Sequence, residues 1–161
     1  MVSIGDFLPN REKNAVIKRS FVPFQVFYLF CPQLSRPKDK YLLFVCENPL
    51  MLFFISKEPR KALLNNPKLQ QCQVELDPKV NSFLSRKSNK SYVNCSDPVT
   101  TFTIAEIKHQ LRKDMGRIKG QIDDNSRNNV IKSVNSCPKL EQRKQHQILA
   151  FLQLPSDKKN T

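Results

Sequence analysis

Basic side chains and one hydroxyl occupy two points of the chain that a β-hairpin would bring together. Arg36, Lys38 and Lys40 precede one apolar run, and Ser56 and Lys57 follow the next. Because antiparallel pairing places the start of the first run beside the end of the second, we expect Lys40 and Ser56 at the same end of the ladder. Ammonium and guanidinium groups neutralise phosphate oxygens, and a hydroxyl adds a hydrogen bond. The pattern therefore predicts a phosphate-binding site, although residues of these types are also common at solvated loop ends.

The overall charge agrees with a polyanionic partner. The 161 residues carry 27 Lys and Arg against 14 Asp and Glu, a net charge of +13 with a pI near 9.8. Such a field favours nucleic acid, an anionic membrane or an acidic protein, and does not choose among them. Arg60, Arg117 and Lys119 are further candidates for contact with a phosphate backbone, although a solvated helix end explains the last two equally well. Tyr92 or Phe102 could stack on a base, but aromatic residues at strand spacing more often belong to the core.

Several kinds of site are disfavoured by what the sequence lacks. Three glycines are too few for glycine-rich phosphate loops, and neither GxGxxG nor GxxxxGK[ST] occurs, so a Rossmann enzyme or a P-loop NTPase is not expected. The two histidines, His109 and His146, lie far apart without a metal-binding pattern, and we expect neither a metal nor a cofactor. Glu47 and Glu58 flank the predicted strands and could act as bases, although a lone carboxylate near a turn is usually a solvated surface group.

The cysteines and the apolar runs bear on the compartment. Five cysteines, at positions 31, 46, 72, 95 and 137, are widely spaced and include no CxxC pair. Their odd number predicts buried, reduced thiols without a metal or a disulfide, as in a cytoplasmic protein. The longest apolar run is far shorter than the ~20 residues that a membrane-spanning helix needs. The first residues show no signal-peptide pattern, and we expect no association with a membrane.

The order of the apolar patterns predicts strands first and helices last. Short strand-like runs separated by turns fill the chain up to Ser96, which suits a small antiparallel barrel. Helix signals begin after Thr101, with a capping box from Thr103 to Glu106. A second helix is expected after Asp123 or Asp124, and a third is possible over 139–152. The predicted divisions are a basic N-terminal arm or short first element over 1–19, a barrel with its closing helix over 20–137, and a helical or frayed tail over 138–161.

Residues 20–135 resemble the MazF/PemK toxin family in the order of their short motifs. The strand from Ser91 is followed by Cys-Ser-Asp, a Thr-rich turn, an Ile-x-x-Ile helix, the string Gly-Arg-Ile-x-Gly-x-Ile and a closing amphipathic helix. Upstream, Arg36-Pro37 before the apolar strand 41–45 is similar to the family's entry into its second strand. The run 50–55 ends at Ser56, where the family has Ser or Thr.

The resemblance implies a fold, an activity and partners. Members of the family are SH3-like barrels with a C-terminal helix and are usually dimers. The catalytic members cut single-stranded RNA without a metal, and an acidic antitoxin protein neutralises them. On this basis we expect a metal-independent endoribonuclease of a toxin–antitoxin system, in which Ser56 and one of Arg36, Lys38 and Lys40 serve catalysis, while Lys57, Arg60, Arg117 and Lys119 bind RNA.

Two departures from the family pattern keep alternatives open. Gly5-Asp6, which in the family leads directly into the first strand, stands well before Phe21, and Lys38-Asp39-Lys40 separates the Arg-Pro pair from its strand. Which basic residue holds the position of the family's catalytic arginine is therefore open. The alternatives are a non-catalytic barrel that binds nucleic acid, or an interaction protein whose charge serves an acidic partner.

Overall fold

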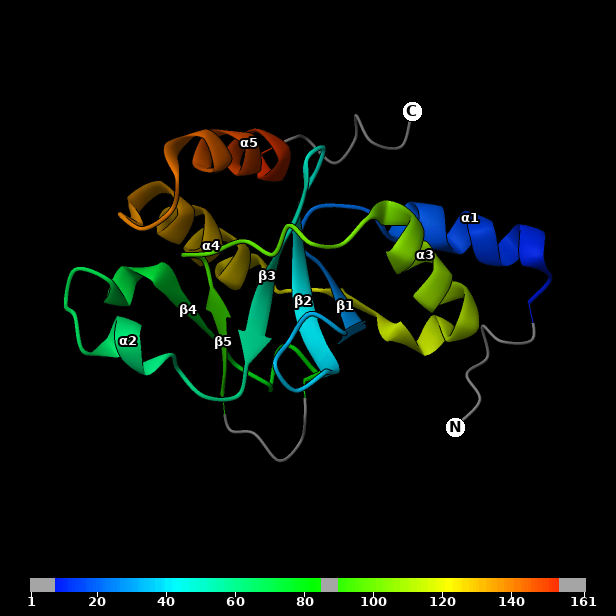
Figure 1. Ribbon diagram of the computed structural model, residues 1–161, viewed down its shortest axis with the longest axis horizontal. Helices are drawn as coiled ribbons and strands as arrows, with labels where there is room; N and C mark the ends of the chain where they lie inside the picture. The colour runs from blue at the N-terminus through cyan, green and yellow to red at the C-terminus, as the bar shows by residue number, and fades with distance from the viewer. Residues whose placement is uncertain (1–7, 85–89, 154–161) are drawn as a thin grey trace.

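The computed structural model describes residues 8–84 and 90–153 and is organised around one antiparallel sheet of six strands in the order β4-β5-β3-β2-β1-β6 (Figure 1). The strands are β1 Gln25–Cys31, β2 Lys38–Glu47, β3 Leu50–Ser56, β4 Gln73–Leu76, β5 Ser91–Asn94 and β6 Ile118–Gln121. The helices are α1 Asn10–Ser20, α2 Lys61–Leu64, α3 Ile104–Lys113, α4 Asp124–Ser136 and α5 Gln142–Leu152. The prediction of an antiparallel sheet with C-terminal helices is confirmed, but the predicted order of strands first and helices last is not, because α1 precedes the sheet, α2 lies between β3 and β4, and β6 follows α3. The sheet is a curled half-barrel, with β4 and β6 at its two edges.

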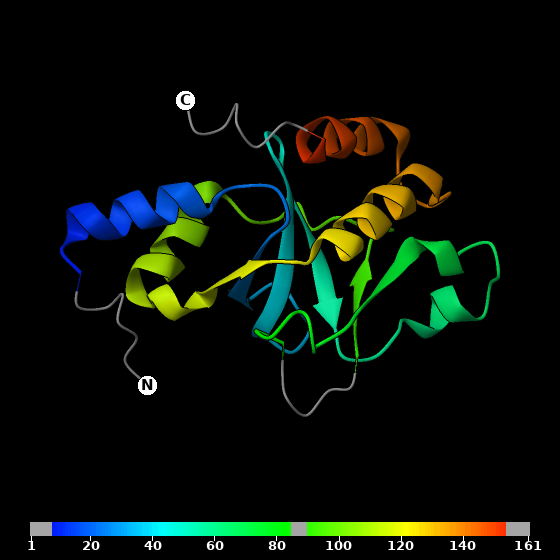
Figure 2. The ribbon, with the colours of Figure 1, turned by 180° about the vertical axis from the view of Figure 1, so that it is seen from behind.

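Two hydrophobic clusters, one on each face, hold this sheet between helices. Side chains alternate along a strand, so the continuous apolar runs of β2 and β3 bury residues on both faces. One face carries Leu43, Phe53 and Val93 and packs against α4 and α5. The other carries Leu42 and Phe44 and packs against α1 and α3. Both views show α1 and α3 together at one side of the sheet, with α4 and α5 at the other (Figures 1 and 2).

The N-terminal segment differs from a loose arm, because residues 10–20 form helix α1. Its sequence is polar and lacks a broad apolar stripe, but Ile17 is fully buried in the cluster beside α3. Arg112 of α3 donates to the side-chain oxygen of Asn14 at 2.9 Å, which ties the two helices together. Tertiary packing therefore stabilises a helix that the local pattern does not predict.

Helices α3 and α4 begin at the predicted residues, and α5 begins at Gln142, within the predicted range 139–152. The Thr103 hydroxyl accepts the backbone N–H of Glu106 at 3.1 Å, which is the N-cap hydrogen bond of the predicted capping box. The Asp123 carboxylate accepts the backbone N–H of Ser126 and so caps α4. The predicted third helix is present as α5. Within the described residues, no helix is long and apolar enough to cross a membrane.

The prediction that no cysteine forms a disulfide is wrong. Cys72 and Cys137, 65 positions apart in sequence, are joined by a disulfide with their Cα atoms 4.9 Å apart. The start of β4 packs against the end of α4, and neither the odd count nor the spacing of the cysteines reveals that proximity. Because stable disulfides belong mainly to oxidising environments, the cysteines no longer support a cytoplasmic location.

The other three cysteines are buried thiols, as predicted. Burial raises the pKa of Cys31 to about 11 and that of Cys95 to about 12. Thiols with such pKa values stay protonated near neutral pH and are poor nucleophiles. We therefore assign Cys31 and Cys95 a packing role.

Candidate functional site

A cavity of about 740 Å³ opens on the α1–α3 face of the sheet, beyond the part that the two helices cover. Its floor consists of alternate residues from three adjacent strands: Lys38 and Lys40 of β2, Phe54 and Ser56 of β3, and Tyr92 and Asn94 of β5. The segment 33–36 between β1 and β2 and the segment 97–101 before α3 supply further lining. The floor therefore rests on strands of the sheet, and its rim comes from loops.

Strand register places Lys40 directly beside Ser56. Tyr41 pairs with Ile55 in the β2–β3 ladder, so Lys40 and Ser56 are the next residues outward on the two strands. The Lys40 ammonium donates to the Ser56 hydroxyl over 3.4 Å, and it lies 5.7 Å from the centroid of the Phe54 ring. The sequence-based expectation that this lysine and this serine meet at one end of the hairpin is confirmed.

The surroundings of Lys40 alter its acidity. Burial, and secondarily the positive charge of Lys38, lower the pKa of Lys40 below its ordinary value. A lysine with a lowered pKa gives up its proton more readily, so Lys40 can neutralise a phosphate and can also donate a proton to a leaving oxygen.

Three further cations surround the cavity at more exposed positions. Arg36, Lys38 and Arg60 all line it, and none of them forms an ion pair with another described residue. Lys57 is exposed and is not among the lining residues. The cavity therefore carries four cationic side chains, of which Lys40 is the one held in place by a strand neighbour.

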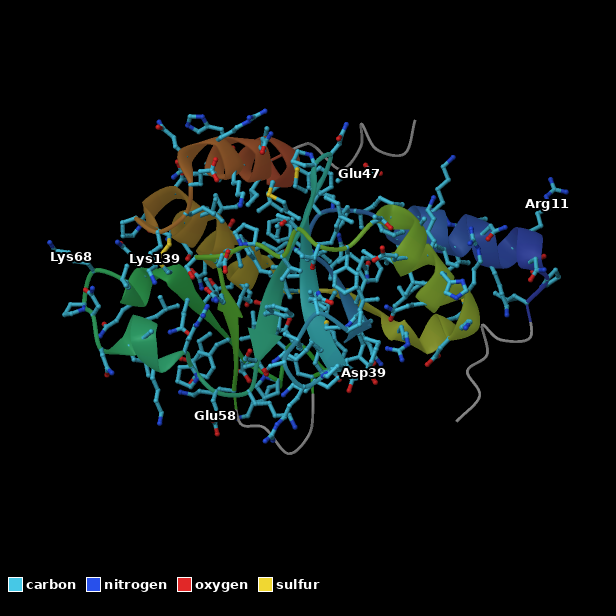
Figure 3. All side chains as sticks on the ribbon, viewed as in Figure 1. Arg11, Asp39, Glu47, Glu58, Lys68 and Lys139 are labelled. Carbon is cyan, nitrogen blue, oxygen red and sulfur yellow. A yellow bond between two sulfur atoms is a disulfide. The ribbon has the colours of Figure 1, made fainter. Side chains whose placement is uncertain are left out.

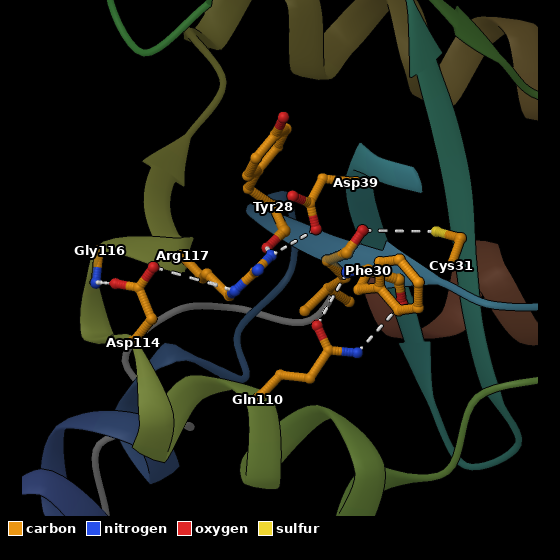
Figure 4. A network of polar contacts seen from close by, with 9 residues as sticks. Tyr28, Phe30, Cys31, Asp39, Gln110, Asp114, Gly116 and Arg117 are labelled. Atoms are coloured by element: carbon orange, nitrogen blue, oxygen red, sulfur yellow. Dashed lines mark hydrogen bonds and ion pairs between the residues drawn. The ribbon is translucent and has the colours of Figure 1, made fainter. Parts of the chain in front are cut away.

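Arg117 and Lys119, predicted to bind RNA, lie away from this cavity. Arg117 donates to Asp39 at 2.9 Å and to the backbone carbonyl of Tyr28 at 2.8 Å (Figure 4). Because Asp39 alternates with Lys38 and Lys40 along β2, it belongs to the opposite face of the sheet. The Lys119 ammonium lies over the Tyr28 ring, 5.7 Å from its centroid. The structure thus separates these two residues from the cluster around Lys40.

We expect the Arg117–Asp39 pair to stabilise the fold. Only 21% of the Arg117 side chain and 34% of the Asp39 side chain are exposed. Replacing Arg117 with Met should lower the free energy of unfolding by about 2 kcal/mol, because Asp39 and the Tyr28 carbonyl would lose a charged donor. Urea unfolding followed by circular dichroism measures this loss. Lys119→Met is the matched control, since Arg117 and Lys119 both lie over the Tyr28 ring, at 5.8 and 5.7 Å, but Lys119 has no described ion pair. Equal losses in both variants would contradict the assignment.

Two carboxylates also line the cavity, and sequence analysis singled out only one of them. Glu58 and Asp97 are both exposed there. Glu58 lies at the end of the sheet that also holds Asp39, whereas Glu47 lies at the opposite end (Figure 3). Glu47 is thereby removed as a candidate base for this cavity, and Glu58 is kept. Asp97 was missed because the turn that follows β5 has no pattern that predicts where it folds back.

Two amide side chains of the cavity were also missed. Gln73 of β4 and Asn94 of β5 line it, opposite each other in the ladder. Tyr92, a sequence-based candidate for base stacking, lines the cavity as well, whereas Phe102 is a buried core residue. The period-two pattern of β4 and β5 predicts that these residues lie on an exposed face of the sheet. It does not predict that this face lines a cavity.

Comparison with known proteins identifies no relative of this chain. Among the described residues, no group of three or more His, Cys, Asp or Glu side chains is arranged to hold a metal ion. No protein-family model, no curated protein and no solved structure matches the sequence or the fold.

Proposed function

We propose that this protein is an endoribonuclease of the MazF/PemK-like kind, with an SH3-like barrel as its core and the cavity around Lys40 as its active site. The observation that carries the proposal is the contact between Lys40 and Ser56 inside a cavity with three more cations. Ammonium and guanidinium groups placed around a phosphodiester stabilise the negative charge that develops as the bond breaks.

The proposed reaction uses the substrate's own nucleophile. The ribose 2′-oxygen attacks the adjacent phosphorus, and the bond from phosphorus to the 5′-oxygen breaks, which leaves a 2′,3′-cyclic phosphate and a free 5′-hydroxyl. Glu58 is the cavity's candidate to accept the proton of the 2′-hydroxyl, and Lys40 is the candidate to protonate the leaving 5′-oxygen. Ser56 orients the Lys40 ammonium and can donate its hydroxyl proton to a phosphate oxygen.

The proposal includes partners and a place of action. The substrate is single-stranded RNA, whose unpaired bases and backbone can enter a cavity on a sheet face. The net charge of +13 suits both this substrate and an acidic antitoxin protein. We further propose a homodimer that meets its RNA substrate in the cytoplasm, a location that rests on the substrate alone, since the Cys72–Cys137 disulfide does not favour it.

Product analysis tests the proposed reaction. Single-stranded RNA incubated with the purified protein in EDTA should yield fragments with 2′,3′-cyclic phosphate and 5′-hydroxyl ends, identified by mass spectrometry. The EDTA matters because the proposed groups need no metal. Absence of cleavage by protein demonstrably free of any bound inhibitor would contradict the proposal, as would cleavage products that carry 5′-phosphates.

A non-catalytic RNA-binding role is the second candidate, and one observation favours it. The cation in contact with Ser56 is a lysine, whereas Arg36 is exposed at the rim. A lysine lacks the planar fork with which arginine binds two phosphate oxygens at once. RNA binding without cleavage would then be the whole activity of the cavity.

Salt dependence measures how many cavity cations contact RNA in either case. The logarithm of the binding constant for single-stranded RNA should fall against the logarithm of salt concentration with a slope of about −0.7 per neutralised phosphate, or about −3 if all four cavity cations engage. Fluorescence anisotropy from low to moderate salt gives the slope. A slope near zero would show that the cavity cations do not contact phosphate, and it would contradict both candidate functions.

A further inference from the structure

The amide side chains of Gln73 and Asn94 are held in one orientation by backbone N–H groups. The Gln73 side-chain oxygen accepts the N–H of Arg60 at 2.8 Å, and the Asn94 side-chain oxygen accepts the N–H of Ser96 at 3.0 Å. The Ser96 hydroxyl adds a second bond to the same Asn94 oxygen, at 2.6 Å. A backbone N–H can only donate, so these contacts settle which end of each amide is the oxygen.

Each amide is therefore left with its NH₂ group available to the cavity. Neither NH₂ group meets an acceptor among the described residues, although both residues line the cavity. Gln73 and Asn94 are also direct partners in the β4–β5 ladder, so they stand side by side on the same face. The floor of the cavity thus offers two neighbouring hydrogen-bond donors. The Asn94 oxygen already accepts two hydrogen bonds, and the Gln73 oxygen is directed at the Arg60 N–H.

We propose that Gln73 and Asn94 form a subsite for a nucleobase that presents two adjacent acceptors. Guanine does so through N7 and O6, and cytosine does so through O2 and N3. Adenine places an NH₂ donor beside N7 and beside N1, and uracil places an N–H between its two carbonyl oxygens. Either of these bases would place one of its own donors against an NH₂ group of Gln73 or Asn94, and both donors would then be desolvated without an acceptor.

The neighbouring residues suit a base in this position. Phe54 continues the row that holds Gln73 and Asn94, as the pairing of Ile55 with Val93 shows. Tyr92 lies on the same face two residues from Asn94, and Ser56 pairs with Tyr92. The floor therefore has an amide row for the base next to a lysine and serine row for the phosphate, with an aromatic residue in each row for stacking.

This inference rests on the proposed function for the identity of the polymer, but its test uses mononucleotides and no cleavage. Titration of the intact protein with GMP, CMP, AMP and UMP, followed by NMR, gives four dissociation constants. The phosphate is common to all four ligands, so their ratio reports base recognition alone. The constants for GMP, CMP or both should be at least about fivefold lower than those for AMP and UMP. The 7-deaza analogue of GMP lacks the N7 acceptor. If the subsite binds guanine through N7 and O6, this analogue should bind more weakly than GMP.

The variants Gln73→Glu and Asn94→Asp keep the size of each side chain and the oxygen that accepts the backbone N–H, while replacing the NH₂ donor with an acceptor. Their combination should abolish the preference for GMP and CMP over AMP and UMP. Thr101→Glu is the control for each single variant, because it adds the same one negative charge at the cavity and should weaken all four ligands while leaving their ratio unchanged.

Three results would overturn the subsite. These are equal affinity for the four nucleotides, no binding of any of them, and a preference that persists in the double variant. The outcome is independent of the nuclease proposal. A preference without RNA cleavage would keep the subsite and reject the nuclease, whereas RNA cleavage with equal nucleotide affinities would do the reverse.

Discussion

Replacing Lys40 with Ala is expected to lower the rate of RNA cleavage by a factor of about 10²–10⁴, because one side chain supplies both charge neutralisation and the proposed proton for the leaving oxygen. Lys40 contacts Ser56 at the open end of the β2–β3 ladder and not in the core, so the fold should persist. A fluorogenic single-stranded RNA measures the rate, and circular dichroism checks the fold. Ser56→Ala should lower the rate less, because it removes a hydroxyl and leaves the charge in place.

The dependence of this rate on pH distinguishes a role for the Lys40 proton from mere packing. Burial and the neighbouring charge of Lys38 lower the pKa of Lys40. If the ammonium form acts, the rate should fall as pH rises through that lowered pKa, at a pH below the ordinary 10.5 of lysine. Lys40→Arg should keep the charge neutralisation but lose much of the rate, because a guanidinium does not give up its proton in this range, and the rate that remains should no longer fall with pH in this way.

Lys61→Ala serves as the control for the loss of a positive charge, because Lys61 is exposed on α2 and does not line the cavity. Its rate should match that of the unaltered protein. Full activity in Lys40→Ala would move the active site away from this cavity. A loss of similar size in Lys61→Ala would show instead that overall charge controls the rate.

The second large effect concerns stability and follows from the disulfide between Cys72 and Cys137. The bond closes a loop of 65 residues, and its removal frees the unfolded chain to occupy many more conformations. For a loop of this length, the chain-entropy relation gives a loss of about 4 kcal/mol in the free energy of unfolding. Urea unfolding of the double variant Cys72→Ala, Cys137→Ala measures the loss.

Reductant supplies the matched comparison. Dithiothreitol should lower the stability of the unaltered protein towards that of the double variant, and should leave the double variant unchanged because its other three cysteines are free thiols. The two expected results together would assign the stabilisation to this one bond. Identical unfolding curves with and without reductant would contradict it.

Local patterns in the sequence were enough for the elements that depend on neighbouring residues. The apolar runs on either side of Glu47-Asn48-Pro49 predicted the β2–β3 hairpin, and the hairpin alone predicted that Lys40 meets Ser56. The caps at Thr103 and Asp123 likewise depend on hydrogen bonds across three residues. In each case the interacting groups are close in the chain, so their types and spacing carry the information.

Contacts between distant segments were decided only when the sheet and its helices assembled. Helix α1 is stabilised by burying Ile17 beside α3, and the disulfide forms because α4 packs against β4. The face on which Arg117 lies depends on its reach to Asp39, 78 positions earlier in the chain. The amide pair of Gln73 and Asn94 also needs both the β4–β5 register and the return of the chain after β5. Residue types specify what each group can do chemically, but burial and long-range packing select which of these groups share a surface.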